Sequence, residues 1–144
     1  MLEDTDLALL DKAENQLKKV AQDIELCRFR SALQSGMALA RETNKYLETQ
    51  APWRTIKSDR VKASTTLWVS MSVINCLKTI MYPFIPFSSK TLHKMLGFSD
   101  DLETNGWNWD KNQLKPGNPI PPPKPLFTKL DEALVDAEYQ GNQQ

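Results

Sequence analysis

The sequence predicts an all-α protein: a helical bundle of about four main helices, followed by an irregular, proline-rich C-terminal segment and a short terminal helix. Apolar residues recur every three or four positions over residues 5–26 and again over 28–49, which is the period of an α-helix. Residues 67–81 are apolar at ten of fifteen positions, as expected for a helix that is buried all round. Prolines then crowd residues 99–126, where neither a helix nor a central strand can form.

The first two helices are expected to form a tight antiparallel hairpin. Acidic residues fill the start of the first helix, where the positive end of the helix dipole favours them. A short polar break near Arg28 marks the turn between the two long helices. The residues expected to face the core are Leu7, Leu10, Ala13, Leu17, Val20 and Ile24 in the first helix and Phe29, Leu33, Met37, Ala40 and Leu47 in the second.

The third helix is expected to lie buried in the middle of the bundle. Pro52 ends the helix before it, because proline cannot continue a helix, and Ser58 or Asp59 is a suitable N-cap for the third. Residues 67–87 carry a single charge, but serine, asparagine and threonine side chains interrupt the run and two prolines break its end. A buried helix therefore explains this stretch better than a membrane span.

The remaining residues are expected to form a short fourth helix and an irregular extension. Ser88 or Ser89 is a candidate cap for this helix, and Gly97 closes it. Its expected inward residues are Leu92, Met95 and Leu96. The predicted organisation is a helical bundle over 1–98, a Trp- and Pro-rich extension over 99–128 that packs on the bundle or on a neighbouring domain, and a short helix with a frayed tail over 129–144.

Charge is balanced overall but distributed unevenly. Residues 27–94 carry eleven basic and three acidic side chains, a net charge of +8, whereas residues 1–26 and 95–144 each carry a net charge of −4. Such a basic zone is typical of a surface that binds phosphate groups, although charges on helices also serve simply as a solvated face. The two cysteines, Cys27 and Cys76, are expected to be buried free thiols, which fits a reducing compartment such as the cytoplasm.

The sequence lacks the motifs of common catalytic sites. It contains no glycine-rich phosphate loop, no nucleophile elbow, no paired acid and base and no metal cluster, and its acidic start, MLEDTD, does not resemble a signal peptide. His93, the single histidine, is expected to be a surface or structural residue rather than a metal ligand or a general base. We therefore expect this chain to hold no cofactor or metal, and to bind a partner rather than to transform one.

Four segments, in order, resemble the C-terminal helical domain of methionyl-tRNA synthetase, a class I aminoacyl-tRNA synthetase. A helix end of the form Asn-x-Tyr-x-x-x-x-x-Pro-Trp matches NKYLETQAPW (44–53), and the helix that leads to it resembles FRSALQSGMALARETNKYL (29–47). A passage with an apolar helix, Pro-x-x-Pro, a short helix and Leu-Gly is similar to LKTIMYPFIPFSSKTLHKMLGF (77–98). The closing segment of the domain is similar to the Trp-x-Trp at 107–109, a Pro-Gly and PPPKPLFTKLD (121–131).

This resemblance covers nearly all of residues 5–131 and implies an anticodon-binding helical bundle. The implied partners are the CAU anticodon loop of tRNA(Met) and the catalytic domain of the parent synthetase, with no role for a membrane. The parent enzyme loads methionine onto tRNA with ATP in an upstream nucleotide-binding domain, whose signature motifs do not occur in this sequence. The family also reads the anticodon from an earlier helix. Because this chain is expected to start after that helix, we expect weaker or less selective anticodon binding.

Pro52 and Trp53 are the site residues that the resemblance implies. In the family this pair meets the anticodon loop, and the tryptophan ring stacks on the first anticodon base. An unstacked loop base needs a flat aromatic surface, and a proline fixes the backbone that aims the ring. A core plug is the alternative for Trp53, whereas Trp68, Trp107 and Trp109 are expected to pack. The candidate contacts with the RNA backbone are the basic residues Arg54, Lys57, Arg60 and Lys62.

Three other interpretations remain open at the level of sequence. A stand-alone tRNA-binding protein acting in trans would share the same residues. A helical protein-interaction module could present NPIPPPKPL (118–126), whose PxxP spacing suits an aromatic groove. An anticodon domain of a synthetase for isoleucine, leucine or valine is disfavoured by the Pro-Trp that follows NKY and by the closing Pro-Leu-Phe.

Overall fold

The computed structural model describes residues 2–129 of the chain. The elements in chain order are α1 (Asp4–Glu25), α2 (Phe29–Gln50), α3 (Pro52–Thr55), α4 (Arg60–Met81), α5 (Pro86–Met95) and the 3-10 helix η1 (Leu102–Asn105). No strand occurs within residues 2–129, and the all-α prediction is confirmed. The two long helices, the buried third and the short fourth correspond to α1, α2, α4 and α5, and the short α3 is an addition. The terminal helix expected after residue 129 lies outside the described residues.

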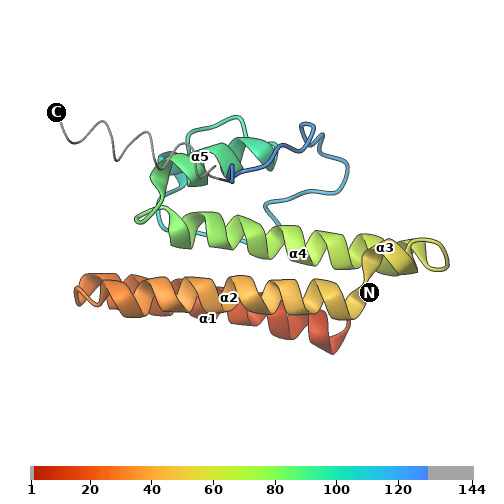
Figure 1. Ribbon diagram of the computed structural model, residues 1–144, viewed down its shortest axis with the longest axis horizontal. Helices are drawn as coiled ribbons and strands as arrows, with labels where there is room; N and C mark the ends of the chain where they lie inside the picture. Colours follow the sequence, from red (N-terminus) through yellow and green to blue (C-terminus); the bar gives the residue numbers. More distant parts are fainter. Residues whose placement is uncertain (1, 130–144) are drawn as a thin grey trace.

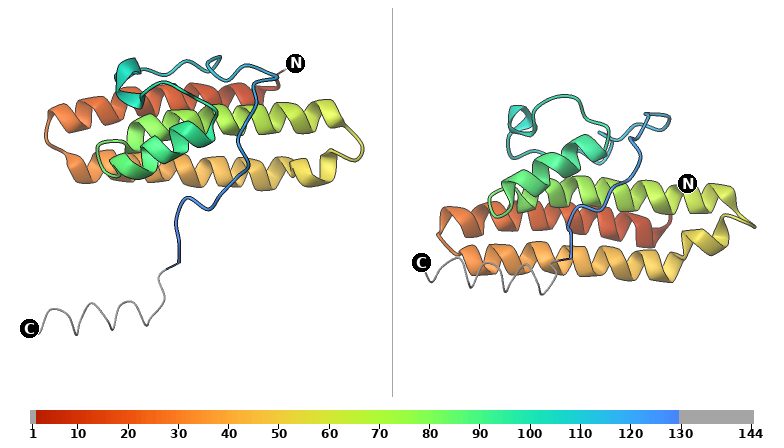
Figure 2. Two further views of the ribbon diagram at one scale, coloured as in Figure 1. Left: turned by 90° about the horizontal axis from the view of Figure 1, so that it is seen from above. Right: turned by 45° about the horizontal axis from the view of Figure 1, so that its top comes forward.

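The three long helices lie side by side along the bundle (Figure 1). α1 and α2 form the expected antiparallel hairpin, and α4 packs against both of them. α5 and the segment that follows it lie on the opposite side of α4, which makes α4 the central layer (Figures 1 and 2). The turn that carries α3 lies at one end of the bundle, close to the start of the chain (Figure 1).

α4 is buried because apolar residues occupy most of its circumference. Its fully buried side chains include Val69, Val73, Cys76 and Ile80. Burial raises the pKa of the Cys76 thiol to about 12, so this thiol stays protonated and packs as a small apolar group. No helix within residues 2–129 is both long and apolar enough to cross a membrane. The core residues that α1 and α2 contribute are Leu9, Leu10, Ala13, Leu17, Val20, Ala32 and Leu39.

The inward face predicted for α2 is wrong by about one position. Phe29, Leu33 and Met37 are exposed, and the residues that face the core instead are Ala32, Gly36, Leu39 and Thr43. A Cβ atom at Gly36 would lie 3.0 Å from both the Ile80 Cγ2 atom and the Met81 sulfur, so the glycine lets α2 approach α4 closely. Close packing at this contact requires small residues, which carry little hydrophobic signal. Apolar periodicity alone therefore identifies the helix but not its buried face.

α1 buries most of the face that the sequence predicts. The predicted residues that are buried are Leu10, Ala13, Leu17 and Val20. Ile24 is half-buried against the core, whereas Leu7 is exposed and Leu9 is buried in its place. The prediction that both cysteines are buried is wrong for Cys27, which is an exposed free thiol. It lies in the turn between α1 and α2 with a φ of 56°, not within a helix.

α5 begins earlier than its expected serine caps. Ile85 occupies the N-cap position and Pro86 the first helical position, where the fixed φ of proline suits a helix and its missing N–H is not needed. Ser88 and Ser89 therefore lie inside the helix, and the prediction of a serine cap is wrong. Gly97 follows the end of the helix as predicted, with a φ of 89° that favours glycine.

Three tryptophans attach the irregular segment to the bundle. Their rings are half-buried, and each indole N–H donates to a backbone carbonyl across the contact. These pairs are Trp68 with Leu114 (2.9 Å), Trp107 with Leu17 (3.1 Å) and Trp109 with Ser72 (2.9 Å). The rings thus bury apolar surface while their polar atoms remain satisfied. The prediction that these three tryptophans serve packing is confirmed.

A buried polar cluster joins α4, α5 and the segment after α5. Lys78 and His93 are almost fully buried, and the Lys78 ammonium lies 2.8 Å from the His93 Nδ1 atom. The His93 ring stacks on Phe98, and its Nε2 atom lies 3.0 Å from the Asp100 carbonyl oxygen. These contacts fit a neutral imidazole that donates from Nε2 and accepts at Nδ1. Burial lowers the pKa of Lys78 to about 8, and burial followed by the Lys78 charge lowers the pKa of His93. His93 is therefore a structural residue and not a surface one.

Acid should destabilise the bundle through His93. Because the folded state depresses the pKa of His93, the unfolded state takes up the additional proton as the pH falls through the usual value of 6.5. We expect the free energy of unfolding, measured by urea denaturation, to fall as the pH drops below about 6.5. His93→Asn removes the titrating group and should flatten this part of the profile. An unchanged slope in the variant would assign the pH dependence to other groups.

Candidate nucleic-acid interface

The chain turns sharply where α2 ends. Ala51 adopts the left-handed conformation, with a φ of 41° and a ψ of 60°, and its N–H donates to the Leu47 carbonyl at 2.9 Å. This conformation is uncommon for a residue with a Cβ atom, and it stops the helix. Pro52 follows as the first residue of α3, where its fixed φ suits a helix start. The Arg54 N–H donates to the Ala51 carbonyl at 2.8 Å and closes this short helix. The prediction that α2 ends at Pro52 is confirmed.

The turn places Pro52 and Trp53 in opposite environments. Pro52 is buried, whereas 56% of the Trp53 surface is exposed. The other three tryptophans are half-buried, so Trp53 differs from all of them. The alternative of Trp53 as a core plug is therefore wrong. Ile56, which is 50% exposed, lies in the same turn, so this end of the bundle presents apolar surface to solvent.

The four basic residues after Trp53 fall into two groups. Arg54, Lys57 and Arg60 are exposed, and none of them forms an ion pair within residues 2–129. The Lys62 ammonium, by contrast, lies 3.1 Å from the Glu3 carboxylate. Three of the four candidate cations are thus free to attract a negatively charged partner, a distinction that their spacing in the sequence does not show.

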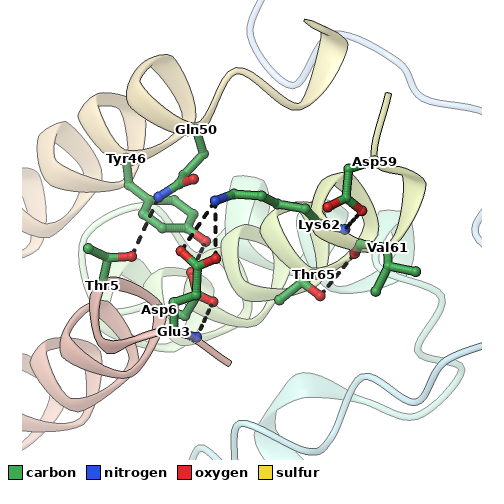
Figure 3. Close-up of polar contacts among 9 residues, drawn as sticks. All are labelled: Glu3, Thr5, Asp6, Tyr46, Gln50, Asp59, Val61, Lys62 and Thr65. Atoms are coloured by element: carbon green, nitrogen blue, oxygen red, sulfur yellow. Dashed lines mark hydrogen bonds and ion pairs between the residues drawn. The ribbon is translucent and has the colours of Figure 1, made fainter. Parts of the chain in front are cut away.

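A hydrogen-bonded network lies beside this turn (Figure 3). The Tyr46 hydroxyl, on α2, donates to one Asp6 carboxylate oxygen at 2.6 Å. The other Asp6 oxygen accepts from the Glu3 N–H at 2.9 Å, so the buried carboxylate has a partner for each oxygen. Burial, followed by the hydrogen bond to Asp6, raises the pKa of the Tyr46 hydroxyl above its usual value. Tyr46 therefore remains a proton donor at physiological pH.

The start of α4 meets the same network. Asp59 is the N-cap of α4, and its carboxylate accepts from the Lys62 backbone N–H at 2.9 Å, which confirms one of the two expected caps. The Lys62 side chain reaches Glu3, the N-cap of α1, and the Gln50 side-chain amide lies 3.5 Å from the Thr5 hydroxyl (Figure 3). The end of α2 and the starts of α1 and α4 thereby surround a polar pocket of about 200 Å³.

This end of the bundle combines an exposed aromatic ring with unpaired positive charge. An exposed indole can stack on an unpaired nucleobase, because every base has a flat π surface. Guanidinium and ammonium groups on the same short segment can contact the phosphates that flank such a base. Of the nearby acids, Glu3 pairs with Lys62, and the Asp59 carboxylate caps α4 at the positive end of the helix dipole.

Two features of the site are not evident from the sequence. The first is the left-handed turn at Ala51 with the short helix after it. The sequence hints at this turn only through Pro52, because a residue before proline avoids the α conformation. The hydrogen bond between Tyr46 and Asp6 has no local signal, because the two residues are 40 positions apart in the chain.

Comparison with known proteins identifies the family. The sequence matches the family described as the anticodon binding domain of methionyl tRNA ligase over residues 2–143, and this chain belongs to that family. The methionine–tRNA ligases of Roseiflexus sp. (strain RS-1) and Dehalococcoides mccartyi are 37% and 38% identical to it over 159 and 130 residues. The two alignments cover 94% and 90% of this chain but 27% and 23% of the relatives' length.

Solved synthetases share the fold. The apo form of Mycobacterium tuberculosis methionyl-tRNA synthetase has a TM-score of 0.81 and 26% identity, over 91% of this chain and 27% of that chain. The same synthetase in complex with methionyl-adenylate has a TM-score of 0.80 and 27% identity, over 90% of this chain and 26% of that chain. This chain thus spans about a quarter of the length of the proteins that it matches.

Asp59 should stabilise the start of α4 through its cap hydrogen bond. We expect Asp59→Ala to lower the free energy of unfolding by about 1 kcal/mol, because the Lys62 N–H loses its acceptor. Asp59→Asn keeps an acceptor oxygen at this position and should cost much less. Urea denaturation of the three proteins measures the difference. Equal losses in the two variants would contradict the role of the cap.

Proposed function

We propose that this chain binds the anticodon loop of tRNA(Met), and that Trp53 stacks on the first base of the CAU anticodon. The observation that carries the proposal is the exposed Trp53 ring held beside a buried proline at the end of the bundle. Membership of a family described as an anticodon-binding domain supports it. Arg54, Lys57 and Arg60, which form no ion pair within residues 2–129, support it further, because they add attraction for phosphate.

Stacking accounts for an exposed indole and for the proline that precedes it. One base stacked on one aromatic ring contributes about 1–3 kcal/mol. The ring is most effective when its position is set before the RNA arrives, since less conformational freedom is then lost on binding. Pro52 supports this arrangement because its own φ is fixed and its side chain is packed in the bundle.

The basic residues contribute attraction that does not depend on sequence. Arg54, Lys57 and Arg60 are exposed on the segment that includes Trp53 and the start of α4. Contacts between such cations and phosphates release counterions and make binding sensitive to salt. Lys62 is engaged with Glu3 and contributes less, because a phosphate would have to compete for it.

We further propose that the chain serves a longer protein that attaches methionine to tRNA(Met) with ATP. The relatives that it matches are methionine–tRNA ligases of about four times its length. In that setting its partners are the tRNA and the catalytic domain, and its compartment is the cytoplasm, where the free thiols Cys27 and Cys76 stay reduced. Family membership favours this role over a stand-alone tRNA-binding protein or a PxxP interaction module.

Trp53→Ala should weaken anticodon binding. We expect a stem-loop with the CAU anticodon to bind more tightly than a GAU version at fixed salt, and Trp53→Ala to cost about 1–3 kcal/mol with CAU. Fluorescence anisotropy of labelled stem-loops measures both affinities. Phe87→Ala is a matched control, because Phe87 is a more exposed aromatic residue, 86% accessible, on α5.

Three other results of this titration would contradict part of the proposal. Equal affinity for the two loops, fading steeply with salt, would indicate phosphate attraction alone and would contradict base selection by Trp53. Unchanged affinity of Trp53→Ala for CAU would contradict stacking on this ring. A loss with Phe87→Ala as large as that with Trp53→Ala would contradict the location of the site.

Lys57→Met should reduce the salt dependence of binding. Loss of one phosphate contact lowers the slope of log K against log salt concentration by about 0.7 for single-stranded nucleic acid. Lys62→Met should change the slope less, because the Lys62 ammonium is already paired with Glu3. Titrations over a range of salt concentrations measure the slopes. Equal changes in the two variants would contradict the division of the basic residues into free and paired groups.

A further inference from the structure

We propose that Tyr46 is a positioning residue for the nucleic-acid site, and that its hydrogen bond to Asp6 fixes the end of α2 from which Trp53 extends. This inference rests on the proposed anticodon binding and adds a residue that acts without touching the RNA. The proposal rests on the hydrogen bonds and the ion pair that link the end of α2, the start of α1 and the start of α4 (Figure 3).

The segment that carries Trp53 is short, and Pro52 is its one buried residue. α3 contains four residues, far fewer than an isolated helix needs to be stable. It begins from Ala51 in the left-handed conformation, and the Trp53 side chain is mostly in solvent. The position of the ring therefore depends on the packing of Pro52 and on where the two ends of the segment are held. These ends are the last turn of α2 and the first turn of α4.

Both ends are attached to the same turn of α1. On the α2 side, the Tyr46 hydroxyl donates to Asp6 at 2.6 Å, one helical turn before Gln50. On the α4 side, the Lys62 ammonium lies 3.1 Å from the Glu3 carboxylate. The Glu3 N–H donates to Asp6 at 2.9 Å and joins the two attachments. The first turn of α1 is thus a common support for the turn that presents Trp53.

The Tyr46 attachment is the stronger of the two. Asp6 is 4% exposed, and a buried carboxylate that loses a donor pays the full cost of its desolvation. The Lys62 and Glu3 side chains are 38% and 56% exposed, and ion pairs with such exposure contribute little. Of the two attachments, the one through Tyr46 therefore contributes more to the support of the turn that presents Trp53.

A double-mutant cycle tests whether Tyr46 acts through Trp53. Tyr46→Phe removes the hydroxyl and keeps the ring. We expect this change to weaken binding of the CAU stem-loop about 3- to 10-fold in the otherwise unchanged chain, the effect of one hydrogen bond. In the Trp53→Ala background the same change should weaken binding by less than about 1.5-fold, because the residue that it positions is gone. Equal losses in the two backgrounds would overturn the proposal.

A matched control is available at the opposite end of α4. Tyr82→Phe also removes a hydroxyl that donates to a carboxylate, that of Glu103, and should leave the affinity unchanged. A loss with Tyr82→Phe equal to that with Tyr46→Phe would show a general effect on stability and would overturn the proposal. If Trp53→Ala itself left the affinity unchanged, stacking on Trp53 would fail, and the measurement on the free protein described next would still decide the role of Tyr46.

The free protein gives a readout that needs no RNA. In protein labelled with 5-fluorotryptophan, the ¹⁹F resonance of Trp53 can be assigned with Trp53→Phe. We expect Tyr46→Phe to shift or broaden this resonance and to leave those of Trp68, Trp107 and Trp109 in place. Glu3→Gln removes the partner charge of Lys62 and should have a smaller effect in the same direction. An unchanged Trp53 resonance, or equal changes in all four, would overturn the proposal.

Discussion

Burial of α4 on both sides is the constraint from which the rest of the bundle follows. A helix that is apolar around most of its circumference must be enclosed, and α1 with α2 covers only one side of it. The other side is covered by α5 and by the irregular segment, whose indole N–H groups reach carbonyls of the bundle. A segment too rich in proline for regular structure can take part in the core in this way, because its tryptophans supply apolar area and satisfy their own polar atoms.

Local periodicity predicts the helices but not every contact between them. The number, order and burial of the long helices follow from apolar spacing and from proline positions. The buried face of α2 does not, because Gly36 is required by the closeness of Ile80 and Met81 on α4, and a glycine adds nothing to a hydrophobic pattern. The start of α5 differs from the prediction because a proline at the first helical position replaces a serine cap.

The features of the candidate site likewise divide into those that the sequence predicts and those that depend on tertiary packing. Pro52 and Trp53 could be selected from the sequence by their resemblance to a family motif, and Asp59 by its cap chemistry. The pairing of Lys62 and the bond between Tyr46 and Asp6 could not be predicted. Each of these depends on which helix ends come together, and this is decided by tertiary packing over separations of 40 residues and more.

Those separations have a consequence for the order in which the chain acquires its function during synthesis. The α1–α2 hairpin is a local structure that can form as soon as Gln50 has left the ribosome, and by then the bond between Tyr46 and Asp6 is within reach. The contact of Lys62 with Glu3 spans 59 residues and must await α4. Trp53 is therefore translated early and positioned late, and a nascent chain holds this ring in a fixed place only once the central helix has docked.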